Sequence, residues 1–263
     1  MPTAEIAGRP LYYERTGAGP GAEPLLLVQG LSGHHQTWGR PLLELLEPRF
    51  DVIVYDHRGI GGSGPVSEPF TLRDLADDAA ALLRALEIED AHVMGISMGG
   101  MVAQQFALDH PEQLRTLTIG CSYCGGPGSS LTDPEDFGKL VMEIQSGDIE
   151  RAIRAAYELN VSPGFHSEEH YAAFREIALA QPAPIPVIML QAQAIAQFDV
   201  QALLGDIDAP TLVIHGTADT WTDPVASRTQ TEEARRRGVA HHGADALISR
   251  RRTRCRRSSG RCS

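Results

Sequence analysis

The segment from residue 91 to residue 109 constrains the fold most, because five residues join an apolar run directly to a helical pattern. Residues 91–96 predict a buried strand and residues 98–109 predict a helix. The turn between them is Gly95-Ile96-Ser97-Met98-Gly99, a G-x-S-x-G sequence. Glycine on both flanks permits a sharp, strained turn, which lifts Ser97 clear beside the free N–H groups of a helix start. The alternative is an ordinary strand-to-helix turn. The strand before the motif and the helix after it favour Ser97 as a nucleophile.

The rest of the chain alternates in the same way. After an antiparallel hairpin at residues 5–17, apolar strands are expected at 25–28, 51–55, 91–96 and 114–119, with helices at 37–46, from 71 and at 98–109. This alternation predicts an α/β fold with a mainly parallel sheet flanked by helices. From about residue 131 to 200 only helical patterns occur, which indicates a helical lid inserted before the sheet resumes near residue 211.

Two further motifs suggest cofactor or metal chemistry. Gly59, Gly61 and Gly64 satisfy G-x-G-x-x-G, but a dinucleotide site needs a helix that opens at the last glycine. The next helix instead begins at Thr71, so we interpret the glycines as a tight loop and expect no cofactor. Cys121 and Cys124 form C-x-x-C. Redox or zinc chemistry is the alternative there to two small buried side chains, which we favour, and no metal is expected.

The charge distribution bears on partners. The net charge is −11, yet residues 235–263 hold ten arginines and one acidic residue, a charge of +9, whereas the preceding residues carry −20. An acidic body disfavours nucleic acid as a partner. No apolar run approaches the roughly 20 residues of a membrane helix, and residues 1–8 do not resemble a signal peptide. We therefore expect no membrane association and a cytoplasmic location.

Four ordered motifs suggest a family. They are the Gln29-Gly30 loop, D-x-R-G-x-G-x-S at residues 56–63, the turn at Ser97, and H-G-x-x-D at residues 215–219. With them the chain resembles the α/β-hydrolase fold family, and among its members small lidded esterases, lactonases, enol-lactonases and cofactor-free haloperoxidases. One departure is Gln29, where relatives usually have histidine, which should alter loop anchoring more than the reaction.

The resemblance implies a set of site residues and three regions. Ser97 would be the nucleophile and Asp219 the acid that orients a histidine; a helix cap is the alternative role of Asp219. The backbone N–H groups of Leu31 and Met98 would form the oxyanion hole. Residues 1–130 and 201–234 would form the hydrolase core, residues 131–200 the helical lid, and residues 235–263 an atypical arginine-rich tail that is disordered or out of frame.

The triad histidine is missing from its expected context, which is a last strand followed by a glycine-flanked histidine and a helix. His241 and His242 lie only 22 and 23 residues after Asp219. One interpretation is a disordered basic tail from which one of them reaches Ser97. A second is a tail that binds nucleic acid or an acidic membrane. The third, which the abrupt rise in arginine favours, is a reading frame altered after about residue 229.

The sequence therefore predicts a serine hydrolase that cleaves a small carboxylic ester or lactone through an acyl-enzyme intermediate. A related acyltransferase or perhydrolase would use the same residues. A catalytically impaired binding protein that keeps the pocket and lacks the triad histidine is the alternative from another class. The expected partner is a small-molecule substrate, and no oligomeric state is predicted.

Overall fold

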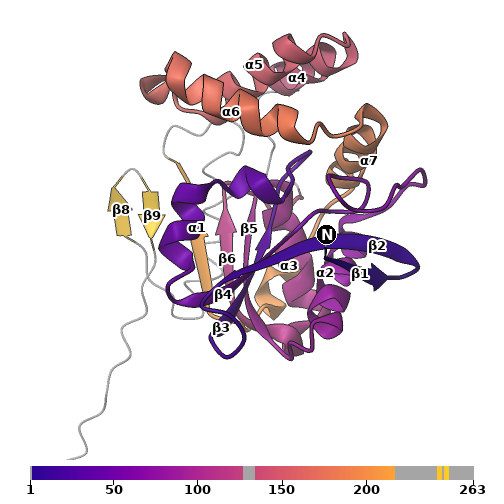
Figure 1. Cartoon of the computed structure of the whole chain (residues 1–263), viewed down its shortest axis with the longest axis vertical. Coiled ribbons are helices and arrows are strands. Elements are labelled where there is room, and N and C mark those ends of the chain that lie inside the picture. The colour runs from indigo at the N-terminus through magenta and orange to yellow at the C-terminus, as the bar shows by residue number, and fades with distance from the viewer. Residues whose placement is uncertain (1, 127–133, 217–241, 245, 249–263) are drawn as a thin grey trace, which may run out of the picture.

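The computed structural model describes residues 2–126, 134–216, 242–244 and 246–248. Seven strands form one sheet in the order β1-β2-β4-β3-β5-β6-β7 (Figure 1). The strands are β1 (Thr3–Ile6), β2 (Arg9–Gly17), β3 (Glu23–Val28), β4 (Phe50–Tyr55), β5 (Ala91–Ile96), β6 (Leu114–Gly120) and β7 (Thr211–Ile214). β1 and β2 run antiparallel to their neighbours, and the other five strands are parallel. The predicted mainly parallel α/β sheet is confirmed.

An antiparallel hairpin lies near the N-terminus, where the sequence predicts one. β1 and β2 pair from Thr3 opposite Tyr12 to Ile6 opposite Arg9. Ala7 and Gly8 form the two-residue connection, with φ of 50° and 75°. Positive φ at both positions matches the twist of the flanking strands in a tight hairpin.

Helices cover both faces of the sheet because the central strands are apolar on both sides. Leu25 and Leu27 of β3 pack with Trp38 and with α1 (Arg40–Leu46) on one face. Leu26 and Val28 belong to the larger core on the other face. That core also contains the buried sides of α2 (Leu72–Ala85) and α3 (Met98–Asp109). Continuous apolar strands are typical of parallel sheets buried on both faces.

Among the described residues between β6 and β7 there are four α-helices, in the segment where the sequence has only helical patterns. They are α4 (Pro134–Gln145), α5 (Ile149–Asn160), α6 (Glu168–Ala180) and α7 (Ile185–Ala196). Figure 1 shows α4, α5 and α6 stacked above the sheet, with α7 leading back toward it. Ile153, Tyr157 and Tyr171 form a small core within this segment, whereas Ala194 and Ile195 of α7 join the main core. α7 is therefore the helix of this segment that is packed into the body of the protein.

Short 3-10 helices connect several of these elements. They are η1 (His35–Trp38), η2 (Pro111–Gln113), η3 (Pro163–Phe165) and η4 (Gln201–Asp206). The helix expected at 37–46 is thus divided into η1 and α1, because Gly39 adopts φ 70° between them. That conformation is left-handed and interrupts a regular helix.

The arginine-rich tail contains two short strands that the sequence pattern does not predict. β8 (His242–Ala244) and β9 (Ala246–Ile248) pair antiparallel, and β9 lies against β7. They form a sheet of their own and do not extend the seven-stranded sheet. Residues 224–236, whose pattern predicts a further helix, and the remainder of the tail lie outside the described residues.

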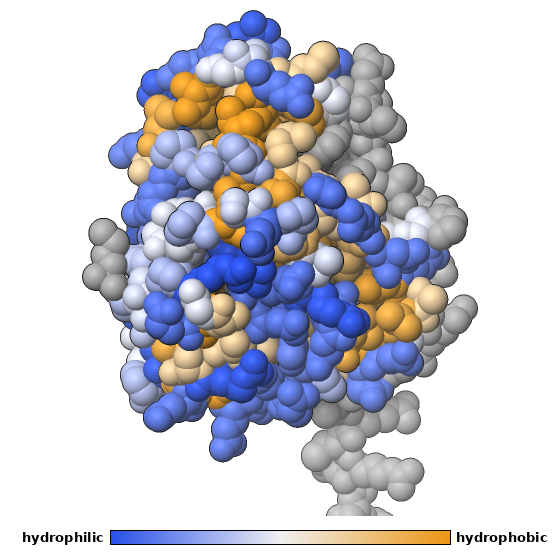
Figure 2. Space-filling model, turned by 90° about the vertical axis from the view of Figure 1, so that its right-hand side faces the viewer, coloured by the Kyte–Doolittle hydropathy of each residue, from blue (hydrophilic) through white to orange (hydrophobic). Residues whose placement is uncertain are grey.

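The surface is unevenly apolar. Figure 2 shows apolar patches on the upper part of the molecule, which Figure 1 identifies as the helical segment, above a more hydrophilic body. Among the described residues, large exposed apolar side chains in this segment are Met142, Ile149, Phe165, Ile185 and Met189. None of the helices in the described part is both long and apolar enough to cross a membrane.

Candidate functional site

Ser97 occupies a strained turn between β5 and α3. Its φ is 53° and its ψ is −126°, a backbone conformation that side-chain-bearing residues seldom adopt. The turn is fixed by its backbone: Ser97 N–H donates to the Gly120 carbonyl at 2.9 Å, and the Ser97 carbonyl accepts from Ser122 Oγ at 2.8 Å. The side chain makes no capping bond to α3 and is exposed. The serine hydroxyl is thus presented outward at the end of the sheet.

The flanking glycines are required by the closeness of the surrounding backbone. A Cβ on Gly95 would overlap the Gly99 carbonyl, and a Cβ on Gly99 would overlap the Val28 carbonyl. No side chain of any size fits at either position. The G-x-S-x-G spacing therefore reflects close packing of α3 against the ends of β5 and β3.

The loop after β3 lies directly against Ser97. We call residues 29–35 the β3 loop. Val28 pairs with Gly95 across the two strands, so the loop leaves the sheet beside the turn that carries Ser97. At Gly30, an added Cβ would be 3.1 Å from Ser97 Cβ and 3.6 Å from its Oγ. The absence of a side chain at Gly30 therefore brings the loop backbone close to the serine hydroxyl.

Almost every N–H group of the β3 loop has an acceptor. Successive donations are Gly30 to Gln29 Oε1 (2.8 Å), Ser32 to Gln191 Oε1 (2.8 Å), Gly33 to the Gly30 carbonyl (3.1 Å), His34 to Thr37 Oγ1 (3.1 Å) and His35 to Asp56 Oδ1 (2.6 Å). Gln29 and Leu31 are the exceptions: no residue in the described part accepts from the N–H of either. The N–H of Met98 begins α3, where a helix provides no internal acceptor. The N–H groups of Leu31 and Met98 are therefore available to an anion.

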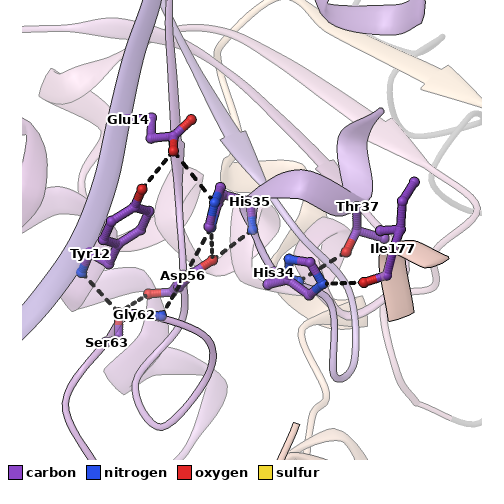
Figure 3. A network of polar contacts seen from close by, with 9 residues as sticks. All are labelled: Tyr12, Glu14, His34, His35, Thr37, Asp56, Gly62, Ser63 and Ile177. Atoms are coloured by element: carbon purple, nitrogen blue, oxygen red, sulfur yellow. Dashed lines mark hydrogen bonds and ion pairs between the residues drawn. The ribbon is translucent and has the colours of Figure 1, made fainter. Parts of the chain in front are cut away.

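The D-x-R-G-x-G-x-S motif ties the β3 loop to the core (Figure 3). Asp56 is fully buried. Its carboxylate accepts hydrogen bonds from the backbone N–H of His35 and, at 2.9 Å, from Gly62 N–H, and it lies 2.9 Å from His35 Nδ1. Ser63 Oγ donates to the Asp56 carbonyl at 2.7 Å, and Glu14 lies 3.5 Å from His35 Nε2. The motif thus acts as an anchor for two loops at the carboxyl ends of β3 and β4.

Two buried histidines hold backbone carbonyls near the site. His57 Nε2 donates to the Gln29 carbonyl at 3.0 Å, and His34 Nε2 donates to the Ile177 carbonyl of α6 at 3.1 Å. Burial lowers the pKa of both rings below the usual histidine value. His34 and His35 both lie in the β3 loop and are buried. Burial and the hydrogen bond to Glu14 raise the pKa of Tyr12, beside His35, to about 12.

The proposed acid and base fall largely outside the described residues. β7 ends at Ile214 beside Gly120, so the H-G-x-x-D motif starts at the same edge of the sheet as Ser97. His215 is buried there. Asp219 and His241 are not among the described residues, and of His242 only its place at the start of β8 is described.

The two cysteines of C-x-x-C differ in environment. Cys124 is buried as expected, but Cys121 is exposed, which corrects the expectation of two buried side chains. Cys121 follows β6 directly with φ 45° and lies one position beyond the Ile96–Gly120 pair, at the sheet edge where Ser97 lies. Within the described ranges, no group of three or more histidine, cysteine or acidic residues could hold a metal ion.

Sequence reasoning missed Gln191 of α7. Its side chain is fully buried and accepts from Ser32 N–H, a contact across 159 positions of the chain. The available signal is a polar residue inside the apolar pattern of residues 185–196, a pattern that by itself predicts only a lid helix. The Asp56 anchor was recognised as a motif, but its contact with His35 was not predicted.

Comparisons with known proteins agree with this geometry. Residues 23–241 match a family model described as the alpha/beta hydrolase fold. "Putative carbamate hydrolase RutD" of Azorhizobium caulinodans is 35% identical over 216 residues, covering 81% of this chain and 78% of that protein. A hydrolase from Pseudomonas aeruginosa PA01 has a TM-score of 0.77 and 26% identity, covering 88% and 86% of the two chains. A thermophilic esterase from Thermogutta terrifontis has a TM-score of 0.69 and 27% identity, covering 89% and 84%.

Proposed function

Because the chain belongs to the α/β-hydrolase fold family, we propose that it is a serine hydrolase that cleaves a small carboxylic ester or lactone. The observation that carries the proposal is the position of Ser97, exposed on a strained turn with the β3 loop against its side chain. The esterase from Thermogutta terrifontis, 27% identical, supports an ester substrate. No metal or cofactor takes part in the proposed reaction.

In the proposed mechanism Ser97 is a covalent nucleophile. Its Oγ attacks the carbonyl carbon while a histidine accepts the hydroxyl proton. The oxygen of the tetrahedral intermediate accepts hydrogen bonds from the N–H groups of Leu31 and Met98. The intermediate then collapses, the C–O bond to the leaving group breaks, and the histidine protonates the departing alcohol. Water, deprotonated by the same histidine, hydrolyses the acyl-enzyme and regenerates Ser97.

The oxyanion hole assignment is supported by the donor inventory of the β3 loop. Leu31 N–H has no acceptor in the described part, although the N–H groups of Gly30 and Ser32 on either side of it are engaged. An N–H without a partner beside a nucleophile is the arrangement that stabilises a developing negative charge. Met98 supplies the second donor from the start of α3.

Asp219 is the proposed acid, and the base is proposed to be a histidine from the residues that follow it. His241 and His242 are the two candidates in this chain. If neither serves, Ser97 has no general base, and the chain is then a hydrolase-fold binding protein or the product of an altered reading frame. A serine without a base is a poor nucleophile at neutral pH.

The helical segment, residues 131–200, is proposed to act as a lid over the site. It lies above the sheet (Figure 1), and its exposed side chains include Phe165, Ile185 and Met189. Apolar side chains on a lid favour an apolar acyl or alcohol group in the substrate.

A carbamate is the second candidate substrate. The relative that is 35% identical carries the name of a carbamate hydrolase. A carbamate carbonyl is attacked by serine in the same way as an ester carbonyl, so the site residues stay the same. Comparing turnover of p-nitrophenyl esters, simple lactones and aryl carbamates by the full chain separates the two classes.

Labelling with a fluorophosphonate tests the nucleophile. We expect the full chain to be labelled at Ser97 and the Ser97→Ala variant to lose the label, because the reagent reacts only with an activated serine. Peptide mass spectrometry locates the adduct. Labelling rates are then measured for separate His241→Ala and His242→Ala variants. The base is the histidine whose loss slows labelling about 100-fold or more. A folded chain that stays unlabelled would refute the proposed hydrolase activity.

A further inference from the structure

We propose that Gln191 of α7 is a positioning residue for the oxyanion hole: its side chain holds the β3 loop so that Leu31 N–H faces the reacting oxygen. This inference rests on the proposed serine-hydrolase function, which it deepens. It starts from one hydrogen bond, 2.8 Å from Ser32 N–H to Gln191 Oε1. Ser32 is the residue next to the proposed donor.

The conformation of Ser32 explains why a clamp is needed. Gly30 to Gly33 form a turn closed by the bond from Gly33 N–H to the Gly30 carbonyl at 3.1 Å. Ser32, the third residue of this turn, has φ 59°. Such a turn normally has glycine at that position, because a residue with a Cβ is strained at positive φ. Without an external partner for its N–H, Ser32 would relax toward negative φ and turn over the peptide that joins it to Leu31.

The environment of Gln191 indicates that its amide is there for this bond. The side chain is fully buried, and within the described residues its Nε2 has no partner. A buried amide with an unsatisfied donor is costly, and an apolar residue would suit this face of α7 better. The amide is therefore retained for the acceptor that it offers to Ser32.

α7 is suited to act as a fixed reference for the loop. Its residues Ala194 and Ile195 belong to the main core, and the side chain of Val187 lies next to Gly59 in the loop after β4. The second bond between the loop and the helical segment, from His34 to Ile177, comes from α6. The proposed oxyanion hole is thus assembled only while α7 is docked on the core.

The first experiment compares Gln191→Met, which keeps the size of the side chain and removes the acceptor, with Gln193→Met on the same helix. Gln193 is exposed and serves as the matched control. We expect Gln191→Met to lower kcat about 10- to 100-fold with KM changed less than about threefold, because a misplaced donor is lost from the transition state rather than from substrate binding. Gln193→Met should match the wild type in both. An unchanged kcat in Gln191→Met, or an equal fall in both variants, would overturn the proposal.

Two further variants separate positioning from a general loss of structure. Gln191→Glu keeps an acceptor oxygen, and at a pH where the buried carboxyl is protonated and neutral it should retain most of the activity. Adding Ser32→Gly to Gln191→Met should recover activity about fivefold or more, because glycine adopts positive φ without strain. If glycine at position 32 brings no recovery while both proteins are folded by circular dichroism, the clamp is not the role of Gln191.

A measurement that does not depend on turnover tests the role of Gln191 separately from the proposed hydrolase activity. Hydrogen exchange of the full chain should show faster exchange of the amides of residues 30–35 in Gln191→Met than in Gln193→Met. Unchanged exchange there would overturn the clamp even if the enzyme is active. Faster exchange would support the clamp on the loop even in a chain that fluorophosphonate does not label. The missing label would then refute the hydrolase proposal and, with it, the role of Gln191 in catalysis.

Discussion

At the scale of the residue, the turn around Ser97 requires glycines without a Cβ on either side. Gly95 faces the Gly99 carbonyl so closely that a single methyl group has no space. The serine itself carries positive φ, and this strain is sustained by the packing of α3 against the strand ends. A change of one carbon atom should therefore disturb both the stability and the nucleophile.

We predict that Gly95→Ala lowers the free energy of unfolding by about 3 kcal/mol, because the added methyl group meets backbone that cannot move without displacing α3. Fluorophosphonate labelling of Ser97 should fall with it. Urea denaturation followed by circular dichroism measures the first effect.

Gly138→Ala is the matched control for that change. Gly138 lies within α4, and nothing lies within 4 Å of the position that its Cβ would occupy. Alanine should stabilise the helix there by about 0.5–1 kcal/mol. Equal unfolding midpoints for the two alanine variants would contradict the close packing at Gly95.

At the scale of the element, the β3 loop has little regular structure and owes its shape to partners from other elements. Asp56, at the end of β4, is the partner on the core side, and α7 supplies the partner on the other side. Loops that carry catalytic groups are commonly fixed in this way by a rigid scaffold. The order of this loop should therefore respond to changes in either partner.

We predict that Asp56→Asn destabilises the protein by about 3 kcal/mol, because asparagine retains one acceptor oxygen where Asp56 serves His35 and Gly62 with two. Labelling of Ser97 should slow as the loop loosens. Asp77→Asn is the control, since Asp77 bonds to His110 at an exposed site and should cost less than about 0.5 kcal/mol. A cost at Asp56 no larger than that at Asp77 would show that the network does not anchor the loop.

At the scale of the whole molecule, buried histidines make the stability of the fold depend on pH. The pKa values of His57 and His34 are lowered mainly by burial, which outweighs the opposing effects of hydrogen-bonded carbonyls and nearby carboxylates. The folded protein therefore binds protons at these two rings less readily than the unfolded chain, which takes them up below about pH 6.5. Their contribution to stability is present above that pH and is lost as the pH falls toward the folded-state values.

We predict that the urea midpoint of unfolding falls between pH 7 and pH 5, and that His57→Gln makes this fall shallower. Glutamine cannot bind a proton in this range but can still donate a hydrogen bond toward the Gln29 carbonyl. The window lies above the range in which Glu23, whose pKa is lowered by Arg115, would titrate. A pH dependence of identical slope in wild type and variant would rule out His57 as its source.

Much of this fold could be predicted from local pattern. The strand at Ala91–Ile96 and the helix at Met98–Asp109 have the predicted bounds, and α2 follows Thr71, where the sequence predicts a helix start, with a capping box to Asp74. These features depend on residues a few positions apart, such as apolar spacing, glycine at a turn and side chains that cap a helix. Such interactions are recorded in the sequence itself.

The contacts that complete the site were decided by tertiary structure. Gln191 reaches Ser32 across 159 positions, and His35 reaches Asp56 across 21. Both follow from how α7 and the strand ends pack, and a polar residue in a helical pattern does not reveal its partner. The sequence by itself determined the parallel sheet and the turn at Ser97, because local geometry restricts the residues allowed there. Only the tertiary structure decided which distant side chains hold the β3 loop, because that depends on long-range packing.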